Sequence, residues 1–186
     1  EDAIRLDPTN RDLVLRAASR DRYALLHAAP PLRADREIVS SAVRHCGDSL
    51  LLSGLRNDRQ IVLEAVRGHG DSLRYAGQSF LGDREVVSAA VKEDGLALRY
   101  ATKELKDDGE LVMAACRQTG RALRHASTRL QGDLEMVMAS LAQTHAAYAY
   151  VSPEERETAY GLDLEARVVY QTLDKFVKGG SDWTLG

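Results

Sequence analysis

A five-residue motif recurs six times along the 186-residue chain, at steps of almost constant length. Its clearest copies are Asp35-Arg36-Glu37-Ile38-Val39 and Asp83-Arg84-Glu85-Val86-Val87. The copies begin at residues 10, 35, 58, 83, 108 and 133, so four steps are 25 residues and one is 23. A period of this length is typical of a repeat protein, in which each unit buries its apolar side against its neighbours. The short step indicates that two residues are missing near Leu55, in the second helix or in the loop after it.

The first half of each unit has the pattern of an amphipathic helix. In the unit that starts at residue 83, apolar residues fill the fourth, fifth, eighth and ninth places, which share one side of a helix. The eighth place is alanine in five units and Ser140 in the sixth, which predicts that two helices approach closely there. The fifth place is valine throughout: Val14, Val39, Val62, Val87, Val112 and Val137.

The predicted first helix has signals at both of its ends. Either the motif's aspartate caps its start, or the preceding residue does so through a capping box such as Asp107 with Glu110. The thirteenth place is glycine in the four central units. There we expect a left-handed conformation that ends the helix. These glycines are Gly47, Gly70, Gly95 and Gly120.

The second half of each unit predicts a second helix. Leu98, Ala101 and Leu105 follow at spacings of three, four and seven, which place them in one stripe. A lone pair of helices of about ten residues is not stable in water. We therefore predict an all-α fold, an α-solenoid of about six 25-residue helix-turn-helix repeats, with about twelve short helices and a C-terminal capping helix.

The pattern divides the chain into two parts. Residues 1–151 form the predicted repeat array, in which 1–9 resemble the tail of a preceding unit, with Ala3 in the place of Ala76. Residues 152–186 are predicted to form a capping helix over 164–178 and an extended acidic tail that contains Trp183. The net charge of −3 comes from this tail, because residues 1–151 hold 21 basic and 21 acidic side chains.

Composition limits the classes of function. A balanced array gives no long-range field to attract a polyanion, which argues against nucleic acid as a partner. The longest apolar run falls short of the roughly 20 residues that a membrane span needs. Cys46 and Cys116 lie far apart without a CxxC pattern, and we expect free thiols. The compartment stays open: a reducing one, or an organelle interior if Glu1 is a processed N-terminus.

The units also resemble a known repeat. The order Asp-Arg-Glu-Val-Val, Ala-Val-Lys-x-x-Gly, Ala-Leu-x-Tyr-Ala-x-x-x-Leu is similar to a family catalogued only as domain of unknown function four-one-one-six. Residues 83–107 match this order best, and the likeness covers roughly residues 10–151. Gly109 and Leu134 depart from it, because they replace the motif's arginine. The resemblance implies helical repeats, and it implies neither an activity nor functional residues.

Two places in the second half of the unit give the best candidate contact surface. The eighteenth place carries a tyrosine or histidine in five of the six units, and the seventeenth carries arginine in three, so stacking of units would align an aromatic row beside a basic row. Such rows could grip a peptide or stack bases. The other interpretation is packing between neighbouring units. The candidate residues are Tyr75, Tyr100, His125 and Tyr150 with Arg74, Arg99 and Arg124.

Two places in the first half are further candidates. The tenth place is basic at Arg44, Arg67, Lys92 and Arg117. These side chains form either a stripe for an acidic partner or a solvated face paired with neighbouring acids. The sixth place lies at the edge of the apolar stripe, and we expect some of its side chains to be exposed unless a partner covers them. They are Leu15, Leu63, Met113 and Met138.

These patterns favour binding over catalysis. The leading hypothesis is a non-catalytic protein-protein interaction module, scaffold or complex subunit that binds through the solenoid groove, through the tail with Trp183, or through both. The alternative is a helical repeat that binds single-stranded nucleic acid. A third possibility is a small-molecule or enzyme role at the C-terminal helix, which requires a deep pocket near Tyr160 and Tyr170. We expect no catalytic residues, no cofactor and no metal, although His45 and Cys46 are adjacent.

Overall fold

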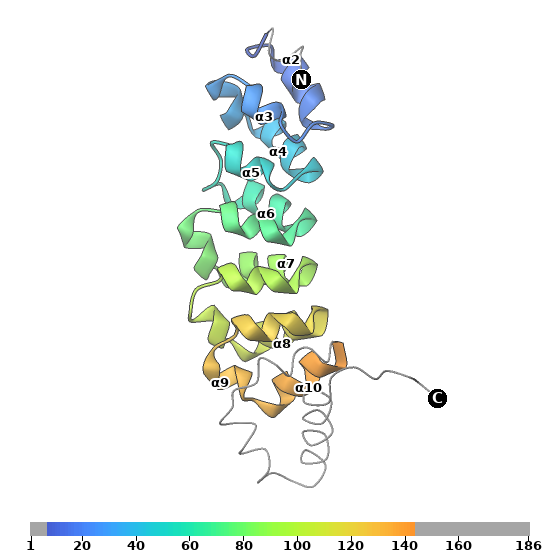
Figure 1. The fold of residues 1–186 in the computed structure, drawn as a ribbon. Coiled ribbons are helices and arrows are strands. Elements are labelled where there is room, and N and C mark those ends of the chain that lie inside the picture. Colours follow the sequence, from blue (N-terminus) through green and yellow to red (C-terminus); the bar gives the residue numbers. More distant parts are fainter. Residues whose placement is uncertain (1–6, 144–186) are drawn as a thin grey trace, which may run out of the picture.

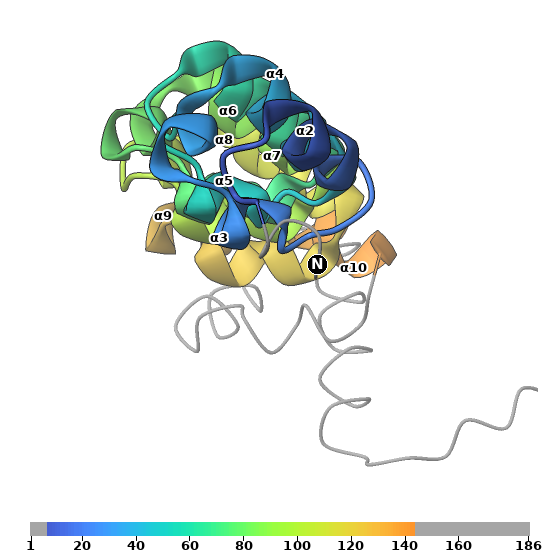
Figure 2. The same ribbon diagram turned by 90° about the horizontal axis from the view of Figure 1, so that it is seen from above.

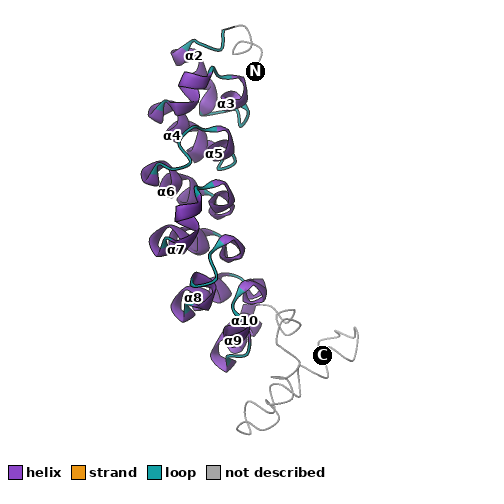
Figure 3. Ribbon diagram, turned by 90° about the vertical axis from the view of Figure 1, so that its left-hand side faces the viewer, coloured by secondary structure: helices purple, strands orange, loops and turns teal. Residues whose placement is uncertain are grey.

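The computed structural model describes residues 7–143, and every regular element in that range is helical (Figure 1). The elements stack into an elongated array with the N-terminal unit at one end (Figures 1 and 3). The predicted all-α repeat fold is therefore confirmed over the described range. Several predicted features lie outside the described residues: Ala3, Tyr150, Tyr160, Tyr170, the capping helix over 164–178 and Trp183.

The first helices of successive units form one row in which each helix contacts the next. They are α2 (Arg11–Ala18), α4 (Arg36–His45), α6 (Arg59–Gly68), α7 (Arg84–Glu93), α8 (Gly109–Gln118) and α10 (Leu134–Gln143). All six fifth-place valines have no exposed surface, and Ser140 is equally buried at the eighth place. The small eighth-place residue allows each helix to lie close to its neighbours, as the pattern predicted.

In the five units whose second halves lie within residues 7–143, the second half differs from the prediction, because it is not one helix. A first short segment is followed by a break and, in four of these units, by a second short helical turn (Figure 3). The first segments are α3 (Ala24–His27), α5 (Ser49–Leu52), η2 (Gly70–Tyr75), η4 (Gly95–Tyr100) and η6 (Gly120–His125). The later turns are η1 (Pro30–Ala34), η3 (Gln78–Gly82), η5 (Leu105–Asp107) and α9 (Thr128–Gln131). The segments labelled η are 3₁₀ helices. The first segments, from α3 to η6, stack as a second row beside the first helices (Figure 2).

The break has a clear physical cause, which is a ladder of backbone hydrogen bonds between units. The Gly77 amide donates to the carbonyl of Arg56 in the preceding unit at 2.9 Å. In a continuous helix that amide would bind a carbonyl four residues earlier in its own unit. The same step recurs along the array: Ala29 to Pro8, Gly54 to Arg33, Thr102 to Leu81 and Ser127 to Lys106, at 2.8–3.0 Å. Side-chain periodicity carries no sign of such a bond, so the sequence pattern alone indicates one helix.

The ladder also locates the two missing residues of the short unit. The next helix cap, Asp58, comes four positions after the ladder donor Gly54, whereas Asp83 comes six positions after Gly77. At this point the unit has only a turn at residues 56–57, where its neighbour has the helical segment η3. Of the two places that the sequence left open, the shortening therefore falls in the loop after the second segment.

The motif's aspartate is itself the helix cap. The Asp83 carboxylate accepts the backbone amides of Glu85 at 3.0 Å and Val86 at 3.1 Å. Aspartates at residues 35, 58, 108 and 133 cap their helices in the same way, and Asn10 does so in the first unit. Such a bond satisfies amides that have no partner inside the helix. Of the two registers that the sequence left open, the structure has this one.

The motif's arginine links each unit to the next. Arg84 binds Asp108 at 2.8 Å and Glu110 at 2.7 Å, which are the first and third residues of the following motif. Arg11, Arg36 and Arg59 make the corresponding contacts. The bond from Arg59 is the main reason that the pKa of the Asp83 carboxyl lies below its usual value. Gly109 cannot form this link, so the departure from the motif ends the arginine series.

The thirteenth-place glycines act differently from the prediction. Gly47, Gly70 and Gly95 do not have a left-handed φ. The helices end instead at extended residues such as His69, with φ −150°. A Cβ atom on Gly70 would lie 2.4 Å from the Ala90 carbonyl oxygen of the next unit. Glycine is therefore required for the close approach of two backbones.

Candidate interaction surface

The exposed sides of the first helices, from α2 to α10, form one surface, which we call the helix face. It consists of three parallel rows taken from the third, sixth and tenth places of each unit. The third-place carboxylates are already paired, because Arg59 binds Glu85 at 2.6 Å and Arg84 binds Glu110 at 2.7 Å. The middle and basic rows thus remain as the surfaces that a partner could use.

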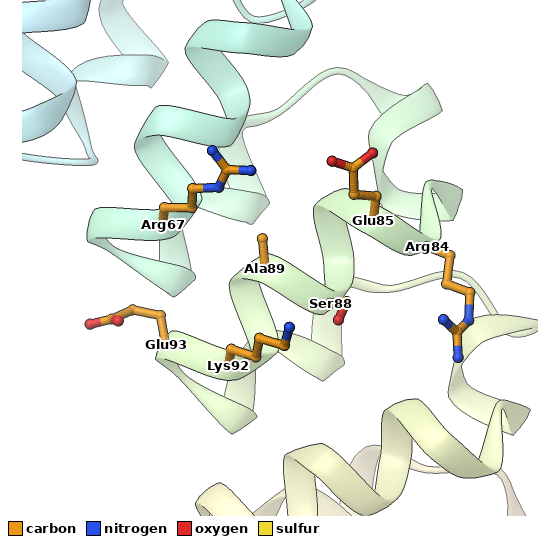
Figure 4. Close-up of a pocket in the computed structure, with 7 residues that line it drawn as sticks. All are labelled: Arg67, Arg84, Glu85, Ser88, Ala89, Lys92 and Glu93. Atoms are coloured by element: carbon orange, nitrogen blue, oxygen red, sulfur yellow. The ribbon is translucent and has the colours of Figure 1, made fainter.

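A groove opens on the helix face between α6 and α7 (Figure 4). Its volume is about 620 Å³. Its lining residues are Arg67, Arg84, Glu85, Ser88, Ala89, Lys92 and Glu93. Ser88 and Ala89 are small, whereas the equivalent places in the preceding unit hold Leu63 and Glu64. Two short side chains in one unit therefore make the hollow.

The tenth-place side chains form the basic row of the helix face: Arg44, Arg67, Lys92 and Arg117. Each lies in the last turn of its helix, where a cation complements the negative end of the helix dipole. Arg44 lies 3.4 Å from Glu64. The other three form no ion pair with any residue in the described range. Figure 4 shows the nearby Glu93 extending away from Arg67 and Lys92.

The middle row is partly apolar and partly exposed. Leu15, Leu63 and Met113 are half-buried and pack against the core on one side. Met138 is 42% exposed. The structure therefore confirms that some sixth-place side chains are exposed. Leu63 and Met113 lie in the units before and after the one that holds Ser88 and Ala89.

The tyrosine and arginine rows of the second halves lie elsewhere and are largely engaged within the chain. Tyr75 and Tyr100 are half-buried against the core. Arg74 stacks over the ring of Tyr75 at 4.4 Å, and Arg99 stacks over Tyr100 at 4.6 Å. One face of each ring is thus covered by an arginine from the same unit.

Asp71 joins these two units from the centre of the tyrosine and arginine rows. Its carboxylate accepts the Tyr100 hydroxyl at 2.8 Å, pairs with Arg99, and lies 3.3 Å from Arg74. Burial, followed by the bond to Asp71, raises the pKa of Tyr100. Of the two interpretations left open by the sequence, these contacts favour packing between units.

His125 continues this row and is half-buried. Its Nε2 accepts a hydrogen bond from Arg124 Nε at 2.9 Å, so the ring is neutral. Burial is the main reason that its pKa falls to about 4, and the charges of Arg124, Lys106 and Arg99 lower it further.

The histidine predicts a pH-dependent stability. Between pH of about 6.5, the pKa of an ordinary histidine, and about 4, its pKa in the folded chain, His125 is protonated in the unfolded chain and neutral in the folded one. The free energy of unfolding should therefore decrease as the pH falls through this window. Thermal unfolding measured across this window should show a shallower dependence on pH for His125→Gln than for the parental chain. An unchanged slope in His125→Gln would contradict the assignment.

Sequence reasoning missed an exposed apolar cluster at the N-terminal end of the second row. Leu26 is 47% exposed and Leu51 is 48% exposed. Both occupy the seventeenth place, which is arginine in the next three units. Tyr23 is also exposed nearby in sequence, and Arg22 lies over its ring at 5.3 Å. Alignment of all units at the seventeenth place would have revealed the two leucines.

The cysteines and the histidines give no sign of a metal centre in the described range. Within residues 7–143, no three His, Cys, Asp or Glu side chains are close enough to hold a metal ion. Cys46 and Cys116 are free thiols, as expected. Cys116 is fully buried at a core place, and burial raises its pKa. None of the described helices is both long and apolar enough to cross a membrane.

Comparisons with known proteins agree with the repeat architecture. No curated protein and no solved structure matches the chain. One family profile matches it five times, each time over two consecutive units: residues 10–54, 35–81, 58–106, 83–131 and 108–156. That profile is described as a domain of unknown function. The starts of these matches coincide with the unit boundaries found in the sequence, and the chain therefore belongs to the family Domain of unknown function (DUF4116).

Proposed function

We propose that this chain is a non-catalytic interaction module that binds another protein along the helix face. The observation that carries the proposal is the groove between α6 and α7, with Arg67 and Lys92 on its wall and without an ionic partner in the described range. Protein interfaces combine an apolar centre with a polar rim and favour methionine and arginine. The helix face has this composition, because Leu63 and Met113 lie between the two charged rows.

The regular geometry of the array also supports binding over chemistry. Its backbone is engaged in helices, caps and the ladder between units, which fix the rows of side chains at a constant spacing. Fixed rows on a rigid scaffold reduce the ordering cost when a partner binds. The groove is open and shallow, and its charged side chains stand on exposed helix sides (Figure 4).

The alternative, binding of single-stranded nucleic acid, gains no comparable support from the described residues. Base stacking needs free aromatic faces. Arg74 and Arg99 already cover one face of Tyr75 and Tyr100, and both rings are half-buried against the core.

Site-specific photo-crosslinking in cells that make the protein tests the proposal. A photoreactive residue is placed at Leu63 or at Met113 on the helix face, and a control is placed at Ser79, which is exposed in η3. We expect one discrete protein product from both face positions and none from Ser79. A product from Ser79 alone, or no product from any position, would contradict binding through the helix face.

A further inference from the structure

The basic row has a spacing that restricts what can bind it. Arg67, Lys92 and Arg117 recur once per unit on α6, α7 and α8, which contact one another in order. Packed helices lie about 8–10 Å apart. The row therefore presents one cation about every 8–10 Å along the array.

An extended polypeptide in the polyproline II conformation has a matching period. It has three residues per turn and rises about 3.1 Å per residue, so every third side chain points the same way at intervals of about 9.3 Å. A β-strand does not match, because side chains three positions apart in a strand (i and i+3) point to opposite sides. A helix matches less well, since its side chains return to one face after one turn of about 5.4 Å or after seven residues, about 10.5 Å, and neither falls within 8–10 Å.

The charge balance on the helix face decides the sign of the partner. The third-place carboxylates Glu85 and Glu110 are held by arginines of the preceding units. Glu93 also lines the groove, but its carboxylate points away from Arg67 and Lys92 (Figure 4). The groove between Arg67 and Lys92 thus offers cations to a ligand above a floor of Ser88 and Ala89, where a small apolar side chain would fit.

We propose that the partner is an acidic, extended protein segment with an acidic side chain at every third residue, bound along the basic row. This inference rests on the proposed function, because it names the partner of the same face. Each acidic side chain pairs with one basic residue of successive units, and an apolar side chain between two of them enters the groove. The attraction acts mainly on encounter and on specificity, and salt weakens it.

Titration with labelled peptides tests the proposal on the full chain. The probe is a peptide of tandem Glu-Pro-Leu triplets. One comparison peptide has the same composition with its glutamates clustered at one end, and another has lysine in place of glutamate. We expect the regular acidic peptide to bind at least ~10-fold more tightly than either, with an affinity that decreases as salt increases.

Variants then locate the binding site. Arg67→Glu combined with Lys92→Glu should weaken the regular peptide at least ~10-fold. The milder pair Arg67→Gln and Lys92→Gln should weaken it in the same direction. Arg121→Glu is the matched control, because Arg121 is exposed in η6 on the other row and forms no ion pair within the described range. It should leave the affinity unchanged.

Three results would overturn the inference: equal binding of the clustered peptide, tighter binding of the lysine peptide, or equal weakening by Arg121→Glu. Tighter binding of an oligothymidine with the same dependence on Arg67 and Lys92 would also overturn it, in favour of nucleic acid. If photo-crosslinking captures a partner on the helix face and the acidic peptide does not bind, only this inference fails. If crosslinking finds nothing on that face, the proposed function fails first.

Discussion

Replacement of Gly70 by alanine should destabilise the array by about 2–3 kcal/mol. The added Cβ would lie 2.4 Å from the Ala90 carbonyl oxygen and 2.9 Å from the Asp94 amide nitrogen. Both atoms belong to the backbone of the next unit and cannot rotate away. The substitution must therefore separate two units that share their buried rows, and the cost should exceed the entropic gain that alanine usually brings.

Gly68 provides a matched control two residues earlier. It is the last residue of α6, and a Cβ there would meet nothing within 4 Å. Alanine is favoured over glycine in a helix by up to about 1 kcal/mol, so Gly68→Ala should leave stability unchanged or raise it. Urea unfolding of both variants measures the difference. A Gly70→Ala variant as stable as Gly68→Ala would show that close approach is not the reason for the glycine.

Replacement of Leu98 by alanine should cost about 3 kcal/mol or more. Leu98 has no exposed surface and lies in η4, which contacts α7, α8 and the second-row segments on both sides. Its removal would leave a cavity between units as well as losing buried apolar area. Because the array gains stability from contacts between neighbours, the loss should affect the units on both sides.

Leu51→Ala makes the same chemical change at a site that is 48% exposed. Little buried area is lost there, so the change in the free energy of unfolding should stay below about 1 kcal/mol. Chemical denaturation monitored by circular dichroism compares the two variants. Equal losses at the two leucines would contradict the assignment of Leu98 to the shared core.

The sequence predicted the parts of the fold that side-chain periodicity records. The valine row, the eighth-place row and the repeat boundaries could be predicted because buried places hold apolar or small side chains in every unit. The second half of the unit was predicted as one helix because Leu98, Ala101 and Leu105 have helical spacing. The actual break depends on the amide of Thr102 binding the Leu81 carbonyl, and a backbone bond leaves no side-chain pattern.

The glycines and the candidate site illustrate the same limit. A glycine at a helix end is compatible with a left-handed turn or with close approach, and only the position of the Ala90 carbonyl distinguishes the two for Gly70. The rows of candidate residues could be read from the repeat. The repeat does not show which rows are engaged within the chain, because that depends on Asp71 reaching Arg99 and Tyr100 of the next unit.

The central claim is that each unit is stable only through its neighbours, and the stability of chains with increasing numbers of units tests it most directly. Chains that contain one, two, three and four consecutive units, starting from residues 83–107 and extended toward the N-terminus, would be unfolded in urea. We predict that the single unit shows no cooperative transition and that the free energy of unfolding increases with each added unit. A single unit that folds alone, or a free energy of unfolding that does not change with length, would contradict the account.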